Sequence, residues 1–237
     1  MTRPRIAILG RFTESASALR YRGVVSARAL LEGVWAAGGD PVTLLPGDDA
    51  DALDWTTRLQ GMDGVLLAGG GDLDPCHYGG DSQDPSVYDV DAVQDTADLS
   101  LATYCLTHPI PTLAVCRGLH VVNVVRGGSL VVDMPAAHRH MVQPITLEAG
   151  AEPLGTPGEI LHISCYHHQA IDRLGEGMIV VARSDDGTVE AVTIDAPAWM
   201  VGIQWHPEDT YRDDPRQRRV FEDLVARARD ARAAHAR

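Results

Sequence analysis

Apolar residues in the first half of the chain alternate between short continuous runs and stretches with helical spacing. Residues 3–9, RPRIAIL, are typical of a buried strand, and apolar positions in residues 24–37 recur every three or four residues until Gly38-Gly39 ends the predicted helix. Strands and helices in this order form a mostly parallel sheet with helices on both faces, and functional groups gather at the carboxyl ends of its strands. The same alternation predicts strands at 41–46, 63–72 and 110–115, and helices at 87–107 and from about residue 117.

The second half of the chain has short strands with little helix between them. Asp186-Gly187 separates two apolar runs and is typical of a tight hairpin, and residues 216–234 predict a terminal helix. The predicted strands of this half are 145–149, 160–164, 178–183, 189–194 and 200–205. The sequence contains no repeat, linker or low-complexity tract. We therefore expect residues 1–237 to form a single α/β domain with an antiparallel extension.

Composition narrows the class of protein. The 237 residues are 45% apolar and 22% charged, as in ordinary globular proteins, and the net charge of −13 argues against nucleic acid or an anionic membrane as a main partner. No apolar run approaches the length that spans a bilayer, and IAIL near the N-terminus is too short for a signal peptide. The four cysteines include no CxxC pair. We therefore expect reduced thiols and a cytoplasmic protein.

One cysteine stands where a predicted strand meets a predicted helix. In TLAVCRGLHVVNVVRGG, residues 112–128, an apolar run ends at Cys116, and helical spacing begins just after it. The first turn of a helix favours the thiolate, and a strand-to-helix turn exposes the reactive atom, as in a nucleophile elbow. We therefore interpret Cys116 as a nucleophile whose side chain faces solvent and substrate. Cys105, on one face of a predicted helix, is interpreted as a packing residue.

A nucleophilic cysteine needs a base and a site for negative charge. GIQWHPED, residues 202–209, presents His206 and Glu208 two positions apart, so both side chains point the same way in an extended chain. Glu208 is then placed to orient the imidazole of His206, whose other nitrogen faces the thiol. LLAGGGDLDP, residues 66–75, offers glycine N–H groups that suit an oxyanion hole together with the N–H of Arg117. No Gly-Lys-Ser/Thr follows, so this loop is not a P-loop.

These stretches together resemble the class I glutamine amidotransferase-like superfamily. They are most similar to its stand-alone γ-glutamyl hydrolases of the peptidase C26 type, which include γ-glutamyl-γ-aminobutyrate hydrolase. The resemblance is carried, in order, by GGGDLDPCHYG (69–79), AVCRGLHVVNVVRGGSL (114–130), HHQAI (167–171), DGTVEAV (186–192) and GIQWHPE (202–208). It implies a flavodoxin-like layout and a triad of nucleophile, base and orienter: Cys116, His206 and Glu208. The oxyanion donors that it implies are Arg117 and Gly70, with Gly71 as a rival to Gly70.

The chain departs from these relatives around the expected substrate pocket. Where the family often has glutamine four residues after the cysteine, this chain has His120, and Ser164-Cys165-Tyr166 stands where many relatives have Asn-Ser-Leu. His120 lies one helical turn beyond Cys116, so it either borders the cleft or packs under the elbow. In the cleft, a pKa near neutrality would make the KM depend on pH. The substrate-binding candidates are His120, Tyr166, His167, His168 and Gln169.

The resemblance favours a cysteine hydrolase that cleaves small γ-glutamyl amides through a glutamyl thioester, without a cofactor, as a monomer or homodimer. One alternative is a glutaminase subunit that passes ammonia to a separate synthase chain. Another is a metal-binding or non-catalytic module, suggested by a dense group: His162, Cys165, His167 and His168. Adjacent strand residues point to opposite faces, so His167 and His168 do not easily share one ion, and we predict no metal site. Residues 14–25 match no functional pattern and predict a surface loop.

Overall fold

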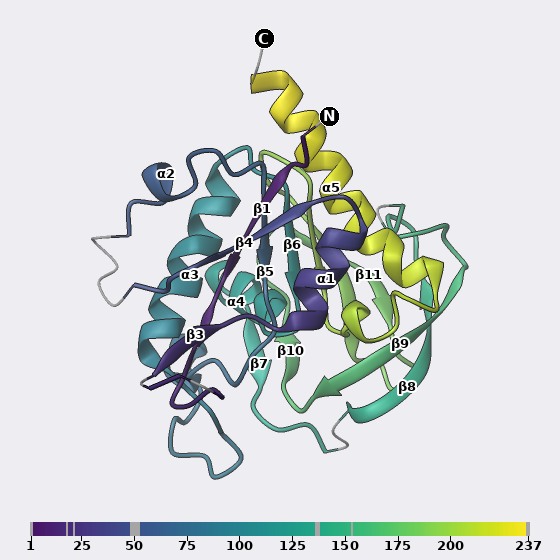
Figure 1. The fold of residues 1–237 in the computed structure, drawn as a ribbon. Helices are drawn as coiled ribbons and strands as arrows, with labels where there is room; N and C mark the ends of the chain where they lie inside the picture. Colours follow the sequence, from purple (N-terminus) through teal and green to yellow (C-terminus); the bar gives the residue numbers. More distant parts are fainter. Residues whose placement is uncertain are drawn as a thin grey trace.

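A nine-stranded mixed sheet runs through the protein (Figure 1). The computed structural model describes residues 2–235, apart from residues 18, 21, 48–52, 136–137 and 153. The first five strands of the sheet, in spatial order, are parallel: β4 (Asp40–Leu44), β1 (Arg5–Leu9), β5 (Gly64–Leu67), β6 (Thr112–Val115) and β13 (Met200–Ile203). An antiparallel extension follows: β12 (Val189–Ile194), β11 (Met178–Arg183), β8 (His138–Leu147) and β9 (Ile160–His167). The predicted fold class is confirmed.

Two pairs of helices cover opposite faces of the parallel strands (Figure 1). The helices are α1 (Arg28–Ala36) with α5 (Pro215–His235), and α3 (Ala92–Thr107) with α4 (Arg117–Val125). Strand β1 shows why its sequence is apolar throughout. Ile6 and Ile8 belong to the core that includes α1 and α5, whereas Ala7 and Leu9 belong to the core that includes α3 and α4. Since alternate residues of a strand face opposite sides, a strand covered on both faces needs a continuous apolar run.

Several element boundaries differ from the predicted ones for local reasons. The side chain of Asp91 accepts hydrogen bonds from the N–H groups of Val93 and Gln94, so α3 begins at Ala92 rather than at residue 87. The first helix begins four residues late because the residues before it pair as a strand, β3, with β2. The short elements that the apolar pattern did not predict are β2 (Arg11–Thr13), β3 (Gly23–Val25), α2 (Trp55–Arg58), η2 (Pro75–Tyr78), β7 (Ser129–Val131), β10 (Ala170–Arg173) and η3 (Pro207–Asp209).

The antiparallel extension follows the predicted pattern most closely at its hairpin. Strands β11 and β12 pair across Asp186-Gly187, and Gly187 has a φ of 88°, which glycine adopts without strain. The predicted strand at 145–149 is only the end of β8, which continues back to His138 and pairs with β9 along most of its length. Residues 14–25 were predicted to be a surface loop; in the structure they end in β3.

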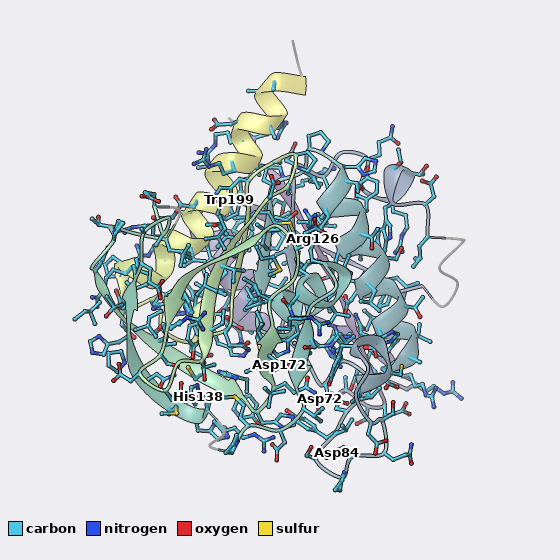
Figure 2. The ribbon with its side chains drawn as sticks, turned by 180° about the vertical axis from the view of Figure 1, so that it is seen from behind. Asp72, Asp84, Arg126, His138, Asp172 and Trp199 are labelled. Carbon is cyan, nitrogen blue, oxygen red and sulfur yellow. The ribbon has the colours of Figure 1, made fainter. Side chains whose placement is uncertain are left out.

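The parallel strands end at one edge of the sheet, and the loops that follow β5, β6 and β13 meet there. Asp72, in the loop after β5, and His138, at the start of β8, lie toward this end of the molecule (Figure 2). Trp199, directly before β13, lies toward the opposite end (Figure 2). The residues with candidate chemistry therefore lie at the edge of the sheet that the topology predicts.

Within the described residues, no helix has the length and apolar character that crossing a membrane requires.

Candidate active site

Cys116 occupies a strained turn between β6 and α4. Its backbone angles, φ 50° and ψ −109°, are unusual for a residue with a side chain and cost about 1–3 kcal/mol. The turn is held in place because the N–H of Cys116 donates to the carbonyl of Ile203 in β13 at 2.7 Å. Gly118 allows α4 to approach β5, since a Cβ at this position would lie 2.3 Å from the carbonyl oxygen of Leu67. This is the strand-to-helix elbow that the sequence predicts.

The thiol is less accessible than the sequence suggested. The side chain of Cys116 is only 5% exposed, whereas we expected it to face solvent. The cleft in front of it has a volume of about 20 Å³, which is room for roughly one water molecule. Two half-exposed rings, Tyr88 and Tyr166, border this cleft. A substrate must therefore displace part of the cleft wall to reach the sulfur.

His206 and Glu208 form a pair at the end of β13, where the chain enters η3. The Nδ1–H of His206 donates to Oε1 of Glu208 at 2.9 Å, as the spacing of two residues predicts. The N–H of His206 donates to the carbonyl of Ser164 in β9, which anchors the residue. Nε2 is buried and makes no ordinary hydrogen bond to any described residue, so it is left for the thiol and the substrate.

The charges around His206 determine its protonation. Burial disfavours the imidazolium, but the adjoining Cys116 and Glu208 outweigh burial and raise the pKa of His206 to about 11. The imidazole therefore keeps its proton at neutral pH, next to a sulfur that gains from a positive neighbour. A protonated imidazole beside a cysteine favours nucleophilic sulfur chemistry.

Gln204 is a site residue that the sequence analysis missed. Its Nε2 donates to Sγ of Cys116 at 3.7 Å, and its Oε1 lies 2.7 Å from Nε2 of His120, which must donate in this pair. A buried chain of hydrogen bonds thus runs from His120 through Gln204 to the sulfur. The signal was present in GIQWHPE, because Gln204 stands two residues before His206 and so points to the same face of an extended strand.

His120 contradicts the expectation of a titrating pocket residue. It borders the cleft, which is the first of the two predicted alternatives, but its side chain is buried. Burial lowers the pKa of His120 to about 4, so the ring is neutral throughout the physiological range. Contrary to the prediction, we therefore expect no dependence of the KM on the charge of His120 between about pH 5.5 and 7.5.

The residues expected to donate to an oxyanion border the same cleft as the thiol. The N–H of Arg117 is at the first position of α4, where it has no intrahelical acceptor. Its side chain turns to α3, where it forms buried ion pairs with Asp95 and Asp98. Gly70 borders the cleft, as does its rival Gly71.

Gly69 makes the closest glycine approach to the triad. A Cβ on Gly69 would lie 3.0 Å from Cε1 of His206 and 3.6 Å from Cβ of Cys116. The glycine triplet therefore allows the loop after β5 to pack against both side chains.

The remaining substrate-binding candidates all border the cleft: Tyr166, His167, His168 and Gln169. His168 is held between two carboxylates, with Nε2 2.9 Å from Asp72 and Nδ1 3.0 Å from Asp133. Nδ1 of His167 lies 2.9 Å from the carbonyl of Gln169. Tyr166 is half-exposed, and its ring lies 4.5 Å from that of His140.

The four-residue Cys/His group considered from the sequence does not assemble. His162 is exposed, and the carboxylates that flank His168 take up both of its ring nitrogens. Cys165 and His167 do come together, two residues apart on β9. Their neighbours are His138 of β8 and Glu190 of β12, which no sequence pattern connected with them.

Comparisons with known proteins identify the family of the chain. Residues 4–208 match the model of the Peptidase C26 family. The chain belongs to the Peptidase C26 family. The matched range contains the Cys116 elbow, the glycine triplet and the residues His206 and Glu208. The resemblance to class I glutamine amidotransferase-like proteins is thereby confirmed, and the chain is a glutamine amidotransferase-like hydrolase of this family.

Relatives of this C26 chain carry different names. It is 33% identical over 204 residues to "Putative glutamine amidotransferase Rv2859c" of Mycobacterium tuberculosis; the match covers 82% of this chain but only 64% of that protein. It is 29% identical over 208 residues to γ-glutamyl-γ-aminobutyrate hydrolase PuuD of Escherichia coli, covering 80% of each chain. It is 27% identical over 212 residues to protein NtpR of Enterococcus hirae, covering 84% of this chain and 87% of that protein.

A solved structure supports the fold of the family. The crystal structure of a putative GMP synthase subunit from Thermoplasma acidophilum superposes with a TM-score of 0.69 and 17% sequence identity. The superposition covers 99% of this chain and 98% of that one. At this identity the likeness shows the shared α/β fold and no more.

Proposed function

We propose that the protein hydrolyses small γ-glutamyl amides, with Cys116 as nucleophile, His206 as acid and base, and Glu208 as orienter. The observation that carries this proposal is the strained Cys116 elbow beside a His206 ring that Glu208 orients and that keeps its proton at neutral pH. Nucleophile, base and orienting group are the three parts that cysteine-based acyl transfer needs.

The reaction proceeds in two halves. Sγ of Cys116 forms a bond to the γ-carbonyl carbon, and the resulting oxyanion accepts hydrogen bonds from the N–H groups of Arg117 and Gly70. The oxyanion collapses, the C–N bond breaks, and His206 gives its proton to the leaving amine. Water then attacks the glutamyl thioester while His206 takes the proton from that water. The C–S bond breaks, glutamate is released, and the Cys116 thiolate is regenerated.

A second cavity supports a leaving amine larger than ammonia. It has a volume of about 310 Å³ and is bordered by His206, Glu208, Gly69 and Arg11, with apolar side chains of β1 and α1 behind them. His206 must protonate the amine, so the cavity adjoins the group that the leaving amine has to meet. Nη1 of Arg11 is buried and has no hydrogen-bond partner among the described residues. A buried unpaired guanidinium nitrogen suits an amine that itself carries a carboxylate.

A substrate panel without any partner protein tests this proposal. It contains glutamine and two γ-glutamyl amides of matched length, one with a carboxylate on the amine and one without. We expect the carboxylate-bearing amide to have the highest kcat/KM. Arg11→Met should lower that value about tenfold or more, the equivalent of one charge-assisted hydrogen bond, with little change for the neutral amide.

Arg28→Met is the matched control, because Arg28 is exposed on α1 and pairs with Glu32 at the surface. Hydrolysis of glutamine alone would favour the alternative in which the chain is the glutaminase of a two-chain enzyme. Turnover that survives Cys116→Ala would refute the cysteine mechanism.

A further inference from the structure

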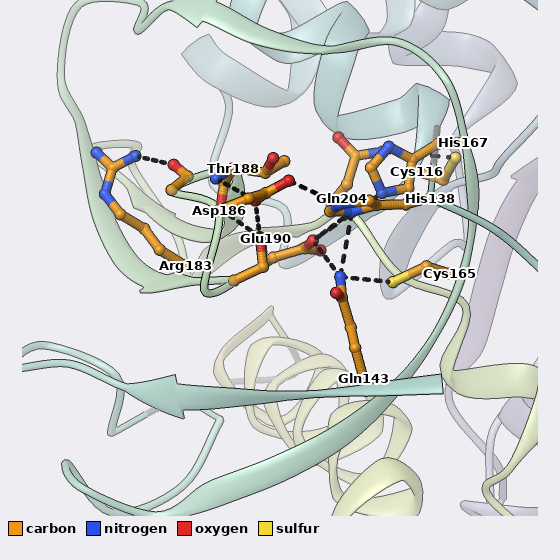
Figure 3. Close-up of polar contacts among 12 residues, drawn as sticks. Cys116, His138, Gln143, Cys165, His167, Arg183, Asp186, Thr188, Glu190 and Gln204 are labelled. Carbon is orange, nitrogen blue, oxygen red and sulfur yellow. Dashed lines mark hydrogen bonds and ion pairs between the residues drawn. The ribbon is translucent and has the colours of Figure 1, made fainter. Parts of the chain in front are cut away.

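Four buried side chains from three strands converge beside the candidate active site (Figure 3). Cys165 and His167 are two residues apart on β9, so they point to the same face, where they meet His138 of β8 and Glu190 of β12. One ligand atom of each side chain lies within 4.8 Å of the other three. We propose that these four residues form a binding site for a zinc ion.

The two imidazoles are held in the orientation that metal ligands adopt. Nδ1–H of His167 donates to the carbonyl of Gln169 at 2.9 Å, which leaves the lone pair of Nε2 directed into the group. Nε2 of His138 lies 2.9 Å from the carboxylate of Asp186, while its Nδ1 lies 3.3 Å from Oε1 of Glu190. Metal-binding histidines typically use their second nitrogen to donate to a carbonyl or carboxylate in this way, which fixes the ring and the tautomer.

Without an ion, this group leaves polar atoms unsatisfied. Glu190 is 0% exposed, and its Oε2 has no hydrogen-bond partner among the described residues. Nε2 of His167 is also buried, and no described residue hydrogen-bonds to it. Such atoms are costly in an apolar interior. A thiolate from Cys165 and the Glu190 carboxylate together carry two negative charges, which a divalent cation neutralises.

The amide nitrogen of Gln143 lies close to three of the four proposed ligand atoms. Its amide nitrogen lies 3.1 Å from Nδ1 of His138, 3.2 Å from Oε1 of Glu190 and 3.5 Å from Sγ of Cys165 (Figure 3). An amide has two hydrogens to donate, and three acceptors face it. Gln143 is only partly buried, so its side chain can turn outward. The ligands would then close around an ion at the usual distances of about 2.0–2.3 Å.

The donor set and the position indicate a structural ion. One thiolate, two imidazoles and one carboxylate suit the tetrahedral, mixed-donor coordination of zinc. Four protein ligands leave no open position for a reacting water. His167 also borders the Cys116 cleft, so the ion would tie the β9 side of that cleft to β8 and β12. The rival arrangement is a metal-free network in which Gln143 and a protonated His138 neutralise Glu190.

Metal binding is tested in a Cys116→Ala background, which removes the thiol that lies next to His206. We expect this variant to bind one equivalent of cobalt(II), with tetrahedral ligand-field bands and a thiolate-to-cobalt charge-transfer band, and zinc should displace the cobalt. Adding Cys165→Ser should remove the charge-transfer band and weaken zinc binding by at least about 100-fold. Adding Cys105→Ser is the matched control, since Cys105 is also a buried thiol but lies in α3.

Glu190→Gln in the same background covers the case in which Cys165→Ser does not fold. This substitution keeps the thiol and the size of the side chain, so zinc affinity should fall while the circular dichroism spectrum stays unchanged. Three results would overturn the proposal: no charge-transfer band with cobalt, a band that survives Cys165→Ser, or unchanged zinc affinity in Glu190→Gln. Each of these would favour the metal-free network.

Discussion

Two groups of cysteine, histidine and glutamate lie within electrostatic reach of each other, and they are built differently. Cys116 sits on a strained elbow, and beside it Nε2 of His206 has no hydrogen-bond partner among the described residues. Cys165 sits within the regular strand β9, and the atoms around it converge on one point. The same residue types thus favour different chemistry, because backbone geometry sets the direction of each lone pair. A sulfur on an elbow that borders a cleft suits a nucleophile, whereas a closed set of four donors suits an ion.

The largest effect that separates the groups is expected from the thiols. Cys116→Ala should lower kcat by at least about 10⁶-fold, because the thioester forms on its sulfur. Cys105→Ala removes a buried thiol outside both groups and should leave kcat unchanged, while lowering the free energy of unfolding by about 1 kcal/mol. Steady-state kinetics and urea unfolding measure the two effects. Retained turnover in Cys116→Ala would assign the chemistry to another residue, with Cys165 the next thiol to replace.

Within the first group, the base should matter more than its orienter. His206→Ala should cost about 10⁶-fold in kcat and Glu208→Gln about 10⁴-fold, by analogy with the unequal losses measured in a serine-protease triad. The imidazole moves the proton, whereas the carboxylate holds the ring and stabilises its charge. Matched single-turnover kinetics of both variants test this order. Equal or reversed losses would mean that the two roles are assigned incorrectly.

The dependence of kcat/KM on pH also tests the roles of His206 and Glu208. The pKa of His206 is raised to about 11, so the proton that the leaving amine needs is present at neutral pH and is lost as the pH rises toward that value. The kcat/KM of the wild type should therefore fall only at strongly alkaline pH. Glu208→Gln removes a charge that raises this pKa, so the alkaline limb should move to lower pH. A limb at the same pH in both proteins would show that a different group titrates.

A smaller effect is expected at His120. The substitution His120→Gln replaces a ring that donates to Gln204, and it should lower kcat by about tenfold through a weaker hydrogen bond from Gln204 to the sulfur. Because burial keeps this ring neutral above about pH 4, the KM should vary with pH between 5.5 and 7.5 in the same way in both proteins. KM profiles across this range provide the measurement. A dependence that disappears in His120→Gln would restore the ring as a titrating substrate ligand.

Local patterns predicted the scaffold and the main candidate residues of the site. The apolar run and Arg-Gly step around Cys116 predicted the elbow, and the spacing of His206 and Glu208 predicted their hydrogen bond. Such features depend on a few consecutive residues and on backbone periodicity, so they can be read from a sequence. Short elements such as β2 and β3 were missed, because three-residue strands carry too little pattern to detect.

By itself, the sequence determined a mostly parallel sheet with an antiparallel extension and a cysteine placed at the end of β6. Only the tertiary structure decided that His120 is buried and neutral, that the guanidinium of Arg117 turns to α3, and that Glu190 and His138 join Cys165. The physical reason is that charge, burial and convergence depend on which strands become neighbours and in which register. β8, β9 and β12 are separated by many residues along the chain, and the order of strands in the sheet brings their side chains to one point.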